Sequence, residues 1–183
     1  MEFLENLLKI GALKFGEFTL ASGERSGFYL DLRLLPSYPD LFDNVSKKLW
    51  KMAKSVDWDI VIGIPTAGVP FATYVAILDR KPLNMIRKEP KDHGTRRLIE
   101  GIDILNKKIL LVDDLISSGV SKEFAIRTIR DEGGIVHDLL VVADRRENEQ
   151  AGKLWEEKLS VKLHSLYYLP PSEVAKFGKR VPV

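Results

Sequence analysis

The stretch Ile109-Leu-Leu-Val-Asp-Asp-Leu-Ile-Ser-Ser-Gly-Val-Ser121 carries more information about the fold than any other part of the chain. Its apolar residues predict a buried strand over residues 108–112, with two adjacent acids, Asp113 and Asp114, at the strand end. A turn rich in serine and glycine follows and leads directly into a helix predicted over residues 121–132. A strand, a short polar turn and a helix in this order indicate one unit of a parallel α/β sheet.

The same alternation of strand and helix continues on both sides of this stretch. Apolar runs predict further strands over residues 59–63, 82–86, 135–142 and 161–166. Helical spacing of apolar residues predicts helices over residues 2–10, 41–56, 69–79 and 151–159, and short extended pieces over 18–31. We therefore predict an α/β fold in which a central, mostly parallel sheet carries helices on both faces. Ligands of such sheets bind at the carboxyl ends of the strands, so functional residues are expected there.

The composition fits one domain spanning residues 1–183, with 45% hydrophobic residues to form its core. The 28 Lys and Arg residues nearly balance 26 Asp and Glu, so the net charge of +2 is no general signature of nucleic-acid binding. No apolar run approaches the about 20 residues that a membrane-crossing helix needs. The absence of cysteine excludes disulfides and cysteine nucleophiles. Together with an acidic N-terminal segment, these features favour a cytoplasmic protein.

The acid pair needs a partner, because two carboxylates at the edge of a core are costly unless something binds them. Ribose hydroxyls or a metal-bound sugar phosphate would supply that partner. The loop behind the acids offers hydroxyl groups, a glycine and the free N–H groups of a helix N-terminus, which together suit a phosphate. The simpler alternative is that Asp113 and Asp114 form a turn and that the serines only cap the helix.

Two other nucleotide-binding motifs do not fit the sequence. Gly63 and Gly68 have the glycine spacing of a P-loop, but Val69-Pro70 stands where that motif requires lysine and serine or threonine. No Gly-x-Gly-x-x-Gly is present, so the fingerprint of dinucleotide binding is absent as well.

The stretch 109–121 resembles the signature of type I phosphoribosyltransferases, which bind phosphoribosyl pyrophosphate (PRPP). The resemblance implies that family's fold, with a core over about residues 40–160 and a small hood formed by about residues 1–35 and the C-terminal part. It also implies that Asp113 and Asp114 hold the ribose hydroxyls and take part in catalysis. The residues that it assigns to the 5′-phosphate are Ser117, Ser118, Gly119, Val120 and Ser121. This signature leaves the base that accepts the sugar open.

A basic stretch, Arg87-Lys-Glu-Pro-Lys-Asp-His-Gly94, belongs to a segment without periodicity that we expect to be a long mobile loop over residues 87–101. The simpler alternative is a solvated surface loop, as most charged runs are. The stretch resembles the catalytic loop of orotate phosphoribosyltransferases, which reaches into the neighbouring subunit's site. The resemblance implies a homodimer, and diphosphate contacts from Arg87, Lys88, Lys91 and His93, with Lys91 as the main catalytic residue.

The segment from Phe18 to Asp31 is similar to the N-terminal strand pair of the same family. The resemblance implies that Phe28 and Tyr29 line the pyrimidine pocket, while the alternative is that both are core aromatics of a strand. The sequence departs from the family at two positions, with Ala21 where lysine is usual and Gly27 where proline is usual. Because that lysine helps to hold the ligands, the departures bear on orotate affinity and on the identity of the base.

Two further segments follow predicted strands. In Ala143-Asp-Arg-Arg-Glu147, Arg145 takes the position of the family's orotate-binding arginine, which can pair with a planar carboxylate through two hydrogen bonds, and Arg146 is expected at the surface. Ser117 is implied to contact orotate as well as PRPP. The segment Gly63-Ile-Pro-Thr-Ala-Gly-Val-Pro70 resembles the family's pyrophosphate loop, whose backbone amides would come from Thr66, Ala67 and Gly68.

The implied reaction is displacement of pyrophosphate from C1 of PRPP by a ring nitrogen of orotate, which gives orotidine 5′-monophosphate for UMP synthesis. Mg²⁺ is the expected cofactor, and no residue is assigned to it, because magnesium takes few protein ligands. PRPP and orotate are the expected partners, without nucleic acid or membrane. The alternatives are the same chemistry on another base, such as uracil or a purine, or a PRPP-sensing regulator that binds RNA or DNA.

Overall fold

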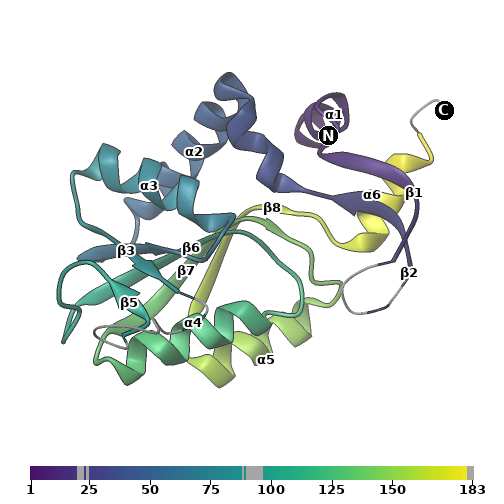
Figure 1. Cartoon of the computed structure of the whole chain (residues 1–183). Helices are drawn as coiled ribbons and strands as arrows, with labels where there is room; N and C mark the ends of the chain where they lie inside the picture. Colours follow the sequence, from purple (N-terminus) through teal and green to yellow (C-terminus); the bar gives the residue numbers. More distant parts are fainter. Residues whose placement is uncertain (20–22, 24, 88, 90–96, 181–183) are drawn as a thin grey trace.

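A computed structural model of the chain describes residues 1–19, 23, 25–87, 89 and 97–180. Its centre is a six-stranded sheet in the order β5-β4-β3-β6-β7-β8 (Figure 1). The strands are β3 (Ile60–Gly63), β4 (Leu83–Ile86), β5 (Ile99–Glu100), β6 (Lys108–Ile116), β7 (Ile135–Asp144) and β8 (Lys162–Tyr168). All neighbours are parallel except β5, which runs antiparallel to β4. The prediction of a mostly parallel sheet is therefore confirmed.

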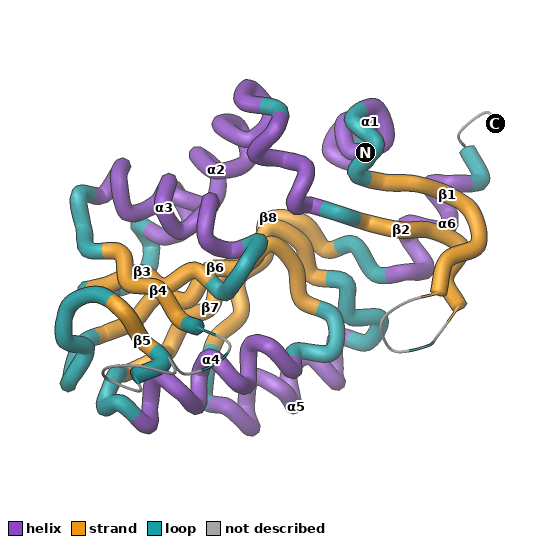
Figure 2. Tube along the Cα trace, viewed as in Figure 1, coloured by secondary structure: helices purple, strands orange, loops and turns teal. Residues whose placement is uncertain are grey.

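Helices cover both faces of this sheet, as Figure 2 shows. They are α2 (Pro39–Ala53) and α3 (Gly68–Asp79) on one face, and α4 (Val120–Asp131) and α5 (Glu149–Leu159) on the other. Alternate residues of β6 serve the two cores, since Leu110 and Val112 pack with α2 and α3 while Ile109 and Leu111 pack on the side of α4. Each of these strand residues is at most 2% exposed, so β6 is buried on both faces.

The hood is built from both ends of the chain. It contains α1 (Glu2–Lys9), the antiparallel hairpin of β1 (Leu13–Thr19) and β2 (Arg25–Leu30), the 3-10 helix η1 (Leu32–Ser37) and α6 (Pro171–Gly178). Figure 1 places α6 beside the hairpin, and the rings of Phe177 and Phe15 lie 6.3 Å apart there. The ring of Phe3 stacks on Tyr167 at 3.8 Å and joins α1 to β8. The hood is thus fixed to the end of the sheet that carries β8.

Two differences from the sequence prediction bear on the residues assigned to the site. The strand β6 continues to Ile116, so Asp113 and Asp114 lie inside the strand rather than at its end. The cause is the length of β7, which still pairs with β6 at Ile116↔Asp144.

The second difference concerns the segment expected to be a loop over residues 87–101, whose last residues form β5. The buried Asn84 side chain fixes the chain just beyond β5, because its amide donates to the Ile102 carbonyl at 2.7 Å and accepts from the Ile102 N–H at 3.1 Å.

Among the helices of the described ranges, none has both the length and the apolar character to cross a membrane.

Candidate active site

Five parallel strands bring their carboxyl ends to one edge of the sheet. This edge carries the described residues of every motif that the sequence analysis assigned to PRPP, and Arg145. They lie in the last residues of β6 and in the segments that follow β3, β4, β6 and β7. This is the place where sheets of this kind bind their ligands. The candidate active site therefore combines four loops that are far apart in the sequence.

The loop between β3 and α3 lies directly against β6. A Cβ atom at Gly68 would lie 2.3 Å from the Val112 carbonyl oxygen and 2.9 Å from the Asp113 Cα. Any side chain at this position would therefore have to push backbone away. Thr66 is exposed beside it, Ala67 precedes the first residue of α3, and the peptide bond between Pro65 and Thr66 is cis. The predicted pyrophosphate loop and the acid pair are thus in contact.

The two acids of β6 have different surroundings. Asp113 is buried, its Oδ1 accepts a hydrogen bond from the Asp114 N–H at 2.8 Å, and its Oδ2 lies 2.6 Å from the Lys122 Nζ. Asp114 is more accessible, and one of its oxygens accepts from the Leu115 N–H at 2.7 Å. Burial, followed by the negative charge of Asp113, raises the pKa of Asp114 to about 7. A hydrogen-bond donor from a ligand would stabilise the charged form of Asp114.

The serine-glycine loop connects β6 to α4. Ser117, Ser118 and Ser121 are exposed, and so is Val120, at 70%. Gly119 has a φ of +80° and precedes the first residue of α4, and a Cβ atom there would lie 2.4 Å from Trp155 Nε1. Both its conformation and its close approach to Trp155 therefore require glycine. The three serines and the start of α4 belong to this one segment, and a helix N-terminus with hydroxyl groups beside it can bind a phosphate.

Arg145 follows β7 and lies against the hood. Its Cζ is 4.9 Å from the centre of the Phe28 ring, and the Phe28 side chain is buried. Arg145 Nε is buried without a hydrogen-bond partner, and burial lowers the pKa of this guanidinium. No carboxylate of the described residues forms an ion pair with it. A partly buried arginine without a counter-ion is prepared for an anion.

The aromatic pair of β2 is divided between two faces of the hairpin. Successive side chains of a strand point in opposite directions, so Phe28 faces Arg145 while Tyr29 does not share its surroundings. The Tyr29 hydroxyl accepts a hydrogen bond from Arg33 Nη2 at 3.0 Å, and its ring lies 5.6 Å from Phe18. Phe28 is thus the member of the pair that the structure places beside Arg145.

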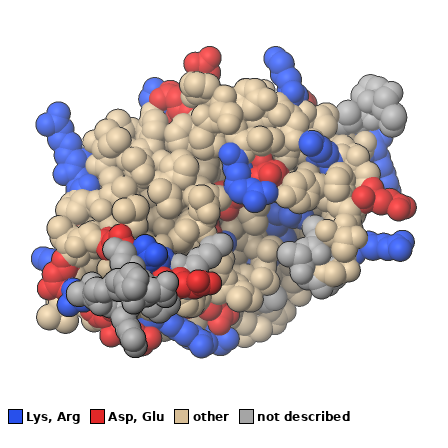
Figure 3. Space-filling model, in the orientation of Figure 1, with Lys and Arg blue, Asp and Glu red and all other residues tan. Residues whose placement is uncertain are grey.

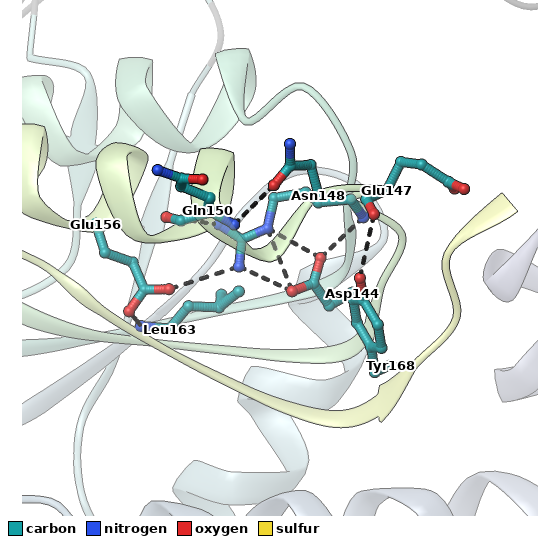
Figure 4. A network of polar contacts seen from close by, with 9 residues as sticks. Asp144, Glu147, Asn148, Gln150, Glu156, Leu163 and Tyr168 are labelled. Carbon is teal, nitrogen blue, oxygen red and sulfur yellow. Dashed lines mark hydrogen bonds and ion pairs between the residues drawn. The ribbon is translucent and has the colours of Figure 1, made fainter. Parts of the chain in front are cut away.

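Arg146 is only partly exposed and its guanidinium is enclosed by acidic groups, which contradicts the expectation of a surface residue. Its side chain is 13% exposed and its guanidinium lies 2.8 Å from Asp144 Oδ2 and 3.5 Å from Glu156 Oε1. It also donates to the Gly152 carbonyl at 3.2 Å. Figure 4 shows Asp144 and Glu156 converging on this network between β7 and α5. The chain leaves the strand at Asp144, so the alternation of the strand does not predict where the next two side chains point.

Replacing Arg146 with alanine is expected to lower the free energy of unfolding by about 3 kcal/mol, because it leaves the buried carboxylate of Asp144 without a cation. Chemical denaturation measures this change. The matched control is Arg127→Ala on α4, an arginine that is 66% exposed and pairs with Glu123, where the loss should stay below about 1 kcal/mol. Equal losses in the two variants would contradict a structural role for the Arg146 network.

The basic stretch contains one described basic residue. Arg87 is exposed at the end of β4, and its Nη1 lies 3.1 Å from Glu100 Oε1 of β5. Lys88, Lys91 and His93 lie outside the described residues, as does Ala21 of the hairpin.

Sequence analysis did not identify Lys122, which the structure brings into the site behind Asp113. One signal was available, since a lysine in the first turn of a helix opposes the helix dipole and gains from an acidic partner nearby.

Comparisons with known proteins identify the family of this chain. Residues 37–159 match the model of the phosphoribosyl transferase domain family. The orotate phosphoribosyltransferase of Saccharolobus solfataricus is 46% identical over 91% of this chain and 83% of its own length. The crystal structure of orotate phosphoribosyltransferase from Aeropyrum pernix is 33% identical, with a TM-score of 0.82 over 96% of this chain and 97% of that chain.

A longer protein contains the same fold. The structure of Leishmania donovani UMP synthase has a TM-score of 0.80 at 26% identity, and the match covers 98% of this chain and 42% of that chain. The chain studied here therefore spans less than half of that protein. The family model matches residues 37–159, and the match to the Saccharolobus solfataricus relative covers 91% of the chain. On this evidence the chain belongs to the orotate phosphoribosyltransferases of the type I phosphoribosyltransferase family.

Proposed function

We propose that this chain transfers the phosphoribosyl group of PRPP to orotate and releases orotidine 5′-monophosphate and pyrophosphate, as a step of UMP synthesis. The observation that carries the proposal is the Arg145 guanidinium, which has no carboxylate partner among the described residues and lies on Phe28. It stands at the same sheet edge as the acid pair and the serine-glycine loop. A cation, an aromatic face and a sugar-phosphate site together suit a planar base that carries a carboxylate.

The chemistry is a displacement in which the ring nitrogen of orotate attacks C1 as pyrophosphate leaves. Positive charge develops on the ribose and negative charge on the leaving group, so catalysis depends on positioning and on electrostatic stabilisation. Asp113 and Asp114 would hold the ribose hydroxyls, and the serine-glycine loop would hold the 5′-phosphate. The backbone of the β3–α3 loop and the basic residues Arg87, Lys88, Lys91 and His93 would neutralise the leaving diphosphate, with Lys91 as the main contributor.

Magnesium is the proposed divalent ion of the reaction. The described residues contain no group of three or more His, Cys, Asp or Glu side chains that could hold an ion by themselves. Mg²⁺ commonly binds through substrate phosphates and keeps several of its waters, so oxygens of PRPP would be its main ligands. Its contribution would be to neutralise part of the diphosphate charge. Omission of the metal, with EDTA added, should abolish turnover, and undiminished turnover under those conditions would contradict its role.

The affinity for PRPP should decrease as the pH falls from about 8 to about 6. The carboxylate form of Asp114 accepts hydrogen bonds from ribose hydroxyls, and its pKa is about 7, so this form is present above that pH and is lost below it. Calorimetry of PRPP binding across this range measures the effect. Because the phosphates of PRPP also titrate, Asp114→Asn is the control. Its affinity should be lower and should vary less with pH, and identical pH profiles would contradict the role of Asp114.

We further propose a cytoplasmic homodimer in which the basic loop of each subunit completes the site of its neighbour. The support is the resemblance of residues 87–94 to the loop that this family shares between subunits. Mixing two inactive variants, Lys91→Ala and Arg145→Ala, should restore part of the activity, since every mixed dimer would contain one site with neither substitution. Activity that stays at the level of the separate variants after subunit exchange would contradict sharing of the loop.

A turnover assay with several bases distinguishes orotate from another base as the substrate. Consumption of orotate, followed by its ultraviolet absorbance, should require PRPP and Mg²⁺, while uracil, hypoxanthine and adenine should not be consumed. Consumption of another base instead of orotate would keep the family and overturn the substrate.

A regulator that binds RNA or DNA would need an added element or a basic face. Figure 3 shows Lys and Arg side chains interspersed with Asp and Glu on the face in view, and the net charge of the chain is +2. Retention on immobilised nucleic acid at physiological salt, without turnover of any base, would favour the regulator.

A further inference from the structure

A buried lysine stands behind the acid pair. Lys122 is the third residue of α4, its side chain is 8% exposed, and its Nζ lies 2.6 Å from Asp113 Oδ2. The same ammonium group donates a hydrogen bond to Ser121 Oγ at 3.1 Å. A lysine here is unfavourable for the helix itself, because the N-terminal turn carries the positive end of the dipole. Burial of the ammonium group adds a further cost unless a carboxylate is paired with it.

The pair makes the two acids of β6 inequivalent. Both oxygens of Asp113 have partners, one in the Asp114 N–H and the other in Lys122. Asp114 accepts from the Leu115 N–H and makes no ion pair with a described cation. The cluster of two acids and one lysine therefore carries one net negative charge when all three groups are ionised, where the two acids alone would carry two.

Lys122 also contacts two parts of the site to which the family resemblance assigns different groups of PRPP. Asp113 belongs to the acid pair assigned to the ribose hydroxyls, and Ser121 belongs to the loop assigned to the 5′-phosphate. The ammonium group contacts both side chains at once. Because Ser121 and Lys122 both belong to α4, a shift of α4 relative to β6 would break the contact between Lys122 and Asp113.

We propose that Lys122 is a positioning residue of the PRPP site, which fixes the acid pair of β6 relative to the serine-glycine loop. The proposal rests on the function proposed above. Because Lys122 is buried and bonded to Asp113, it acts through that carboxylate and not by contact with the diphosphate or with the base.

The first test is the dissociation constant of PRPP, measured by calorimetry in the presence of Mg²⁺. Lys122→Met should weaken PRPP binding by about 10- to 100-fold, as the loss of a partner behind a ligand-holding group does in metal sites. The Km for orotate should stay within about twofold when PRPP is saturating. The matched control is Arg127→Met, which removes one positive charge from the exposed face of the same helix and should bind PRPP like the wild type. Equal PRPP affinity of Lys122→Met and wild type would overturn the proposal.

A double-mutant cycle with Asp113→Asn shows whether Lys122 acts through Asp113. The double variant Asp113→Asn/Lys122→Met has no unpaired buried charge, so it remains a usable protein if Lys122→Met alone does not fold. Its PRPP affinity should be no weaker than that of Asp113→Asn, because the lysine has lost the group through which it acts. A further tenfold loss in the double variant, an additive effect, would overturn the proposal.

The pH dependence of PRPP binding provides a readout that loss of structure alone does not give. The charged groups acting on Asp114 are Asp113 on the same strand and Lys122 on α4, and they act in opposite directions. As the pH falls, the PRPP affinity of Lys122→Met should therefore begin to decrease at a higher pH than that of the wild type. The same pH dependence of PRPP affinity in the variant and the wild type would contradict the proposal.

The outcomes for Lys122 and for the proposed function can be separated. A wild-type chain that does not bind PRPP would refute the proposed function itself. Equal PRPP affinity of the wild type and Lys122→Met would refute the role of Lys122 and would leave the proposed function unaffected.

Discussion

Arg145→Ala is expected to lower kcat/KM for orotate by about 1000-fold while PRPP binding changes little. The Arg145 guanidinium forms no ion pair with a described carboxylate, whereas Arg87 and Lys122 at the same sheet edge each have one. Its contact with Phe28 places it where a planar base would lie. A site built to bind a charged group loses several orders of magnitude when that partner is removed, because the other polar groups remain without a partner. Steady-state rates with varied orotate at saturating PRPP measure the effect.

The stability of the Arg145→Ala variant should distinguish a binding role from a structural one. Arg145 Nε is buried without a hydrogen bond, so its removal should leave the free energy of unfolding unchanged or slightly raised. Arg146→Ala should show the opposite pattern, since Arg146 is held by Asp144 and Glu156. A large loss of stability in Arg145→Ala, in proportion to its loss of activity, would contradict the assignment of Arg145 to the ligand.

Gly68→Ala is expected to lower kcat/KM for PRPP by about 100-fold, because the added methyl group would press on the backbone of β6 at Val112 and Asp113. The pyrophosphate loop and the acid pair would then separate, although no functional group has been removed. The same crowding should lower the free energy of unfolding by about 1–3 kcal/mol. Steady-state rates with varied PRPP and chemical denaturation measure the two effects.

Gly27→Ala is the matched control for this substitution. A Cβ atom at Gly27 meets no atom within 4 Å and its φ lies outside the positive range, although the pairing with β1 is irregular opposite this residue. We therefore expect its kcat/KM for PRPP and its stability to stay close to those of the wild type. If Gly68→Ala behaves like Gly27→Ala, the close contact between the β3–α3 loop and β6 has no functional importance.

The core of the fold and the centre of the site could be predicted because their signals are local in the sequence. The apolar residues of β6, the two acids and the serine-glycine loop follow one another directly, so one stretch defines a strand, its ligand-binding edge and the start of α4. The same holds for Gly63–Gly68, where a short strand is followed by a glycine that the structure packs against β6.

The features that could not be predicted depend on how separate elements pack. The pairing of Lys122 with Asp113 needs the orientation of α4 on β6, and the extension of β6 to Ile116 needs the length of β7. Arg145 and Arg146 are neighbours in the sequence, but one is left without a carboxylate and the other is enclosed by two. Their difference arises from the hood on one side and α5 on the other, which no local pattern records.

The most direct test of the proposed function is a ³¹P NMR measurement of the wild-type reaction with PRPP, Mg²⁺ and orotate. We predict that the PRPP signals disappear only when orotate is present, and that one new phosphomonoester and one pyrophosphate appear for each PRPP consumed. The phosphomonoester should match orotidine 5′-monophosphate. Ribose 5-phosphate with pyrophosphate at an equal rate with and without orotate, or no change in PRPP, would contradict the assignment of this site to orotate.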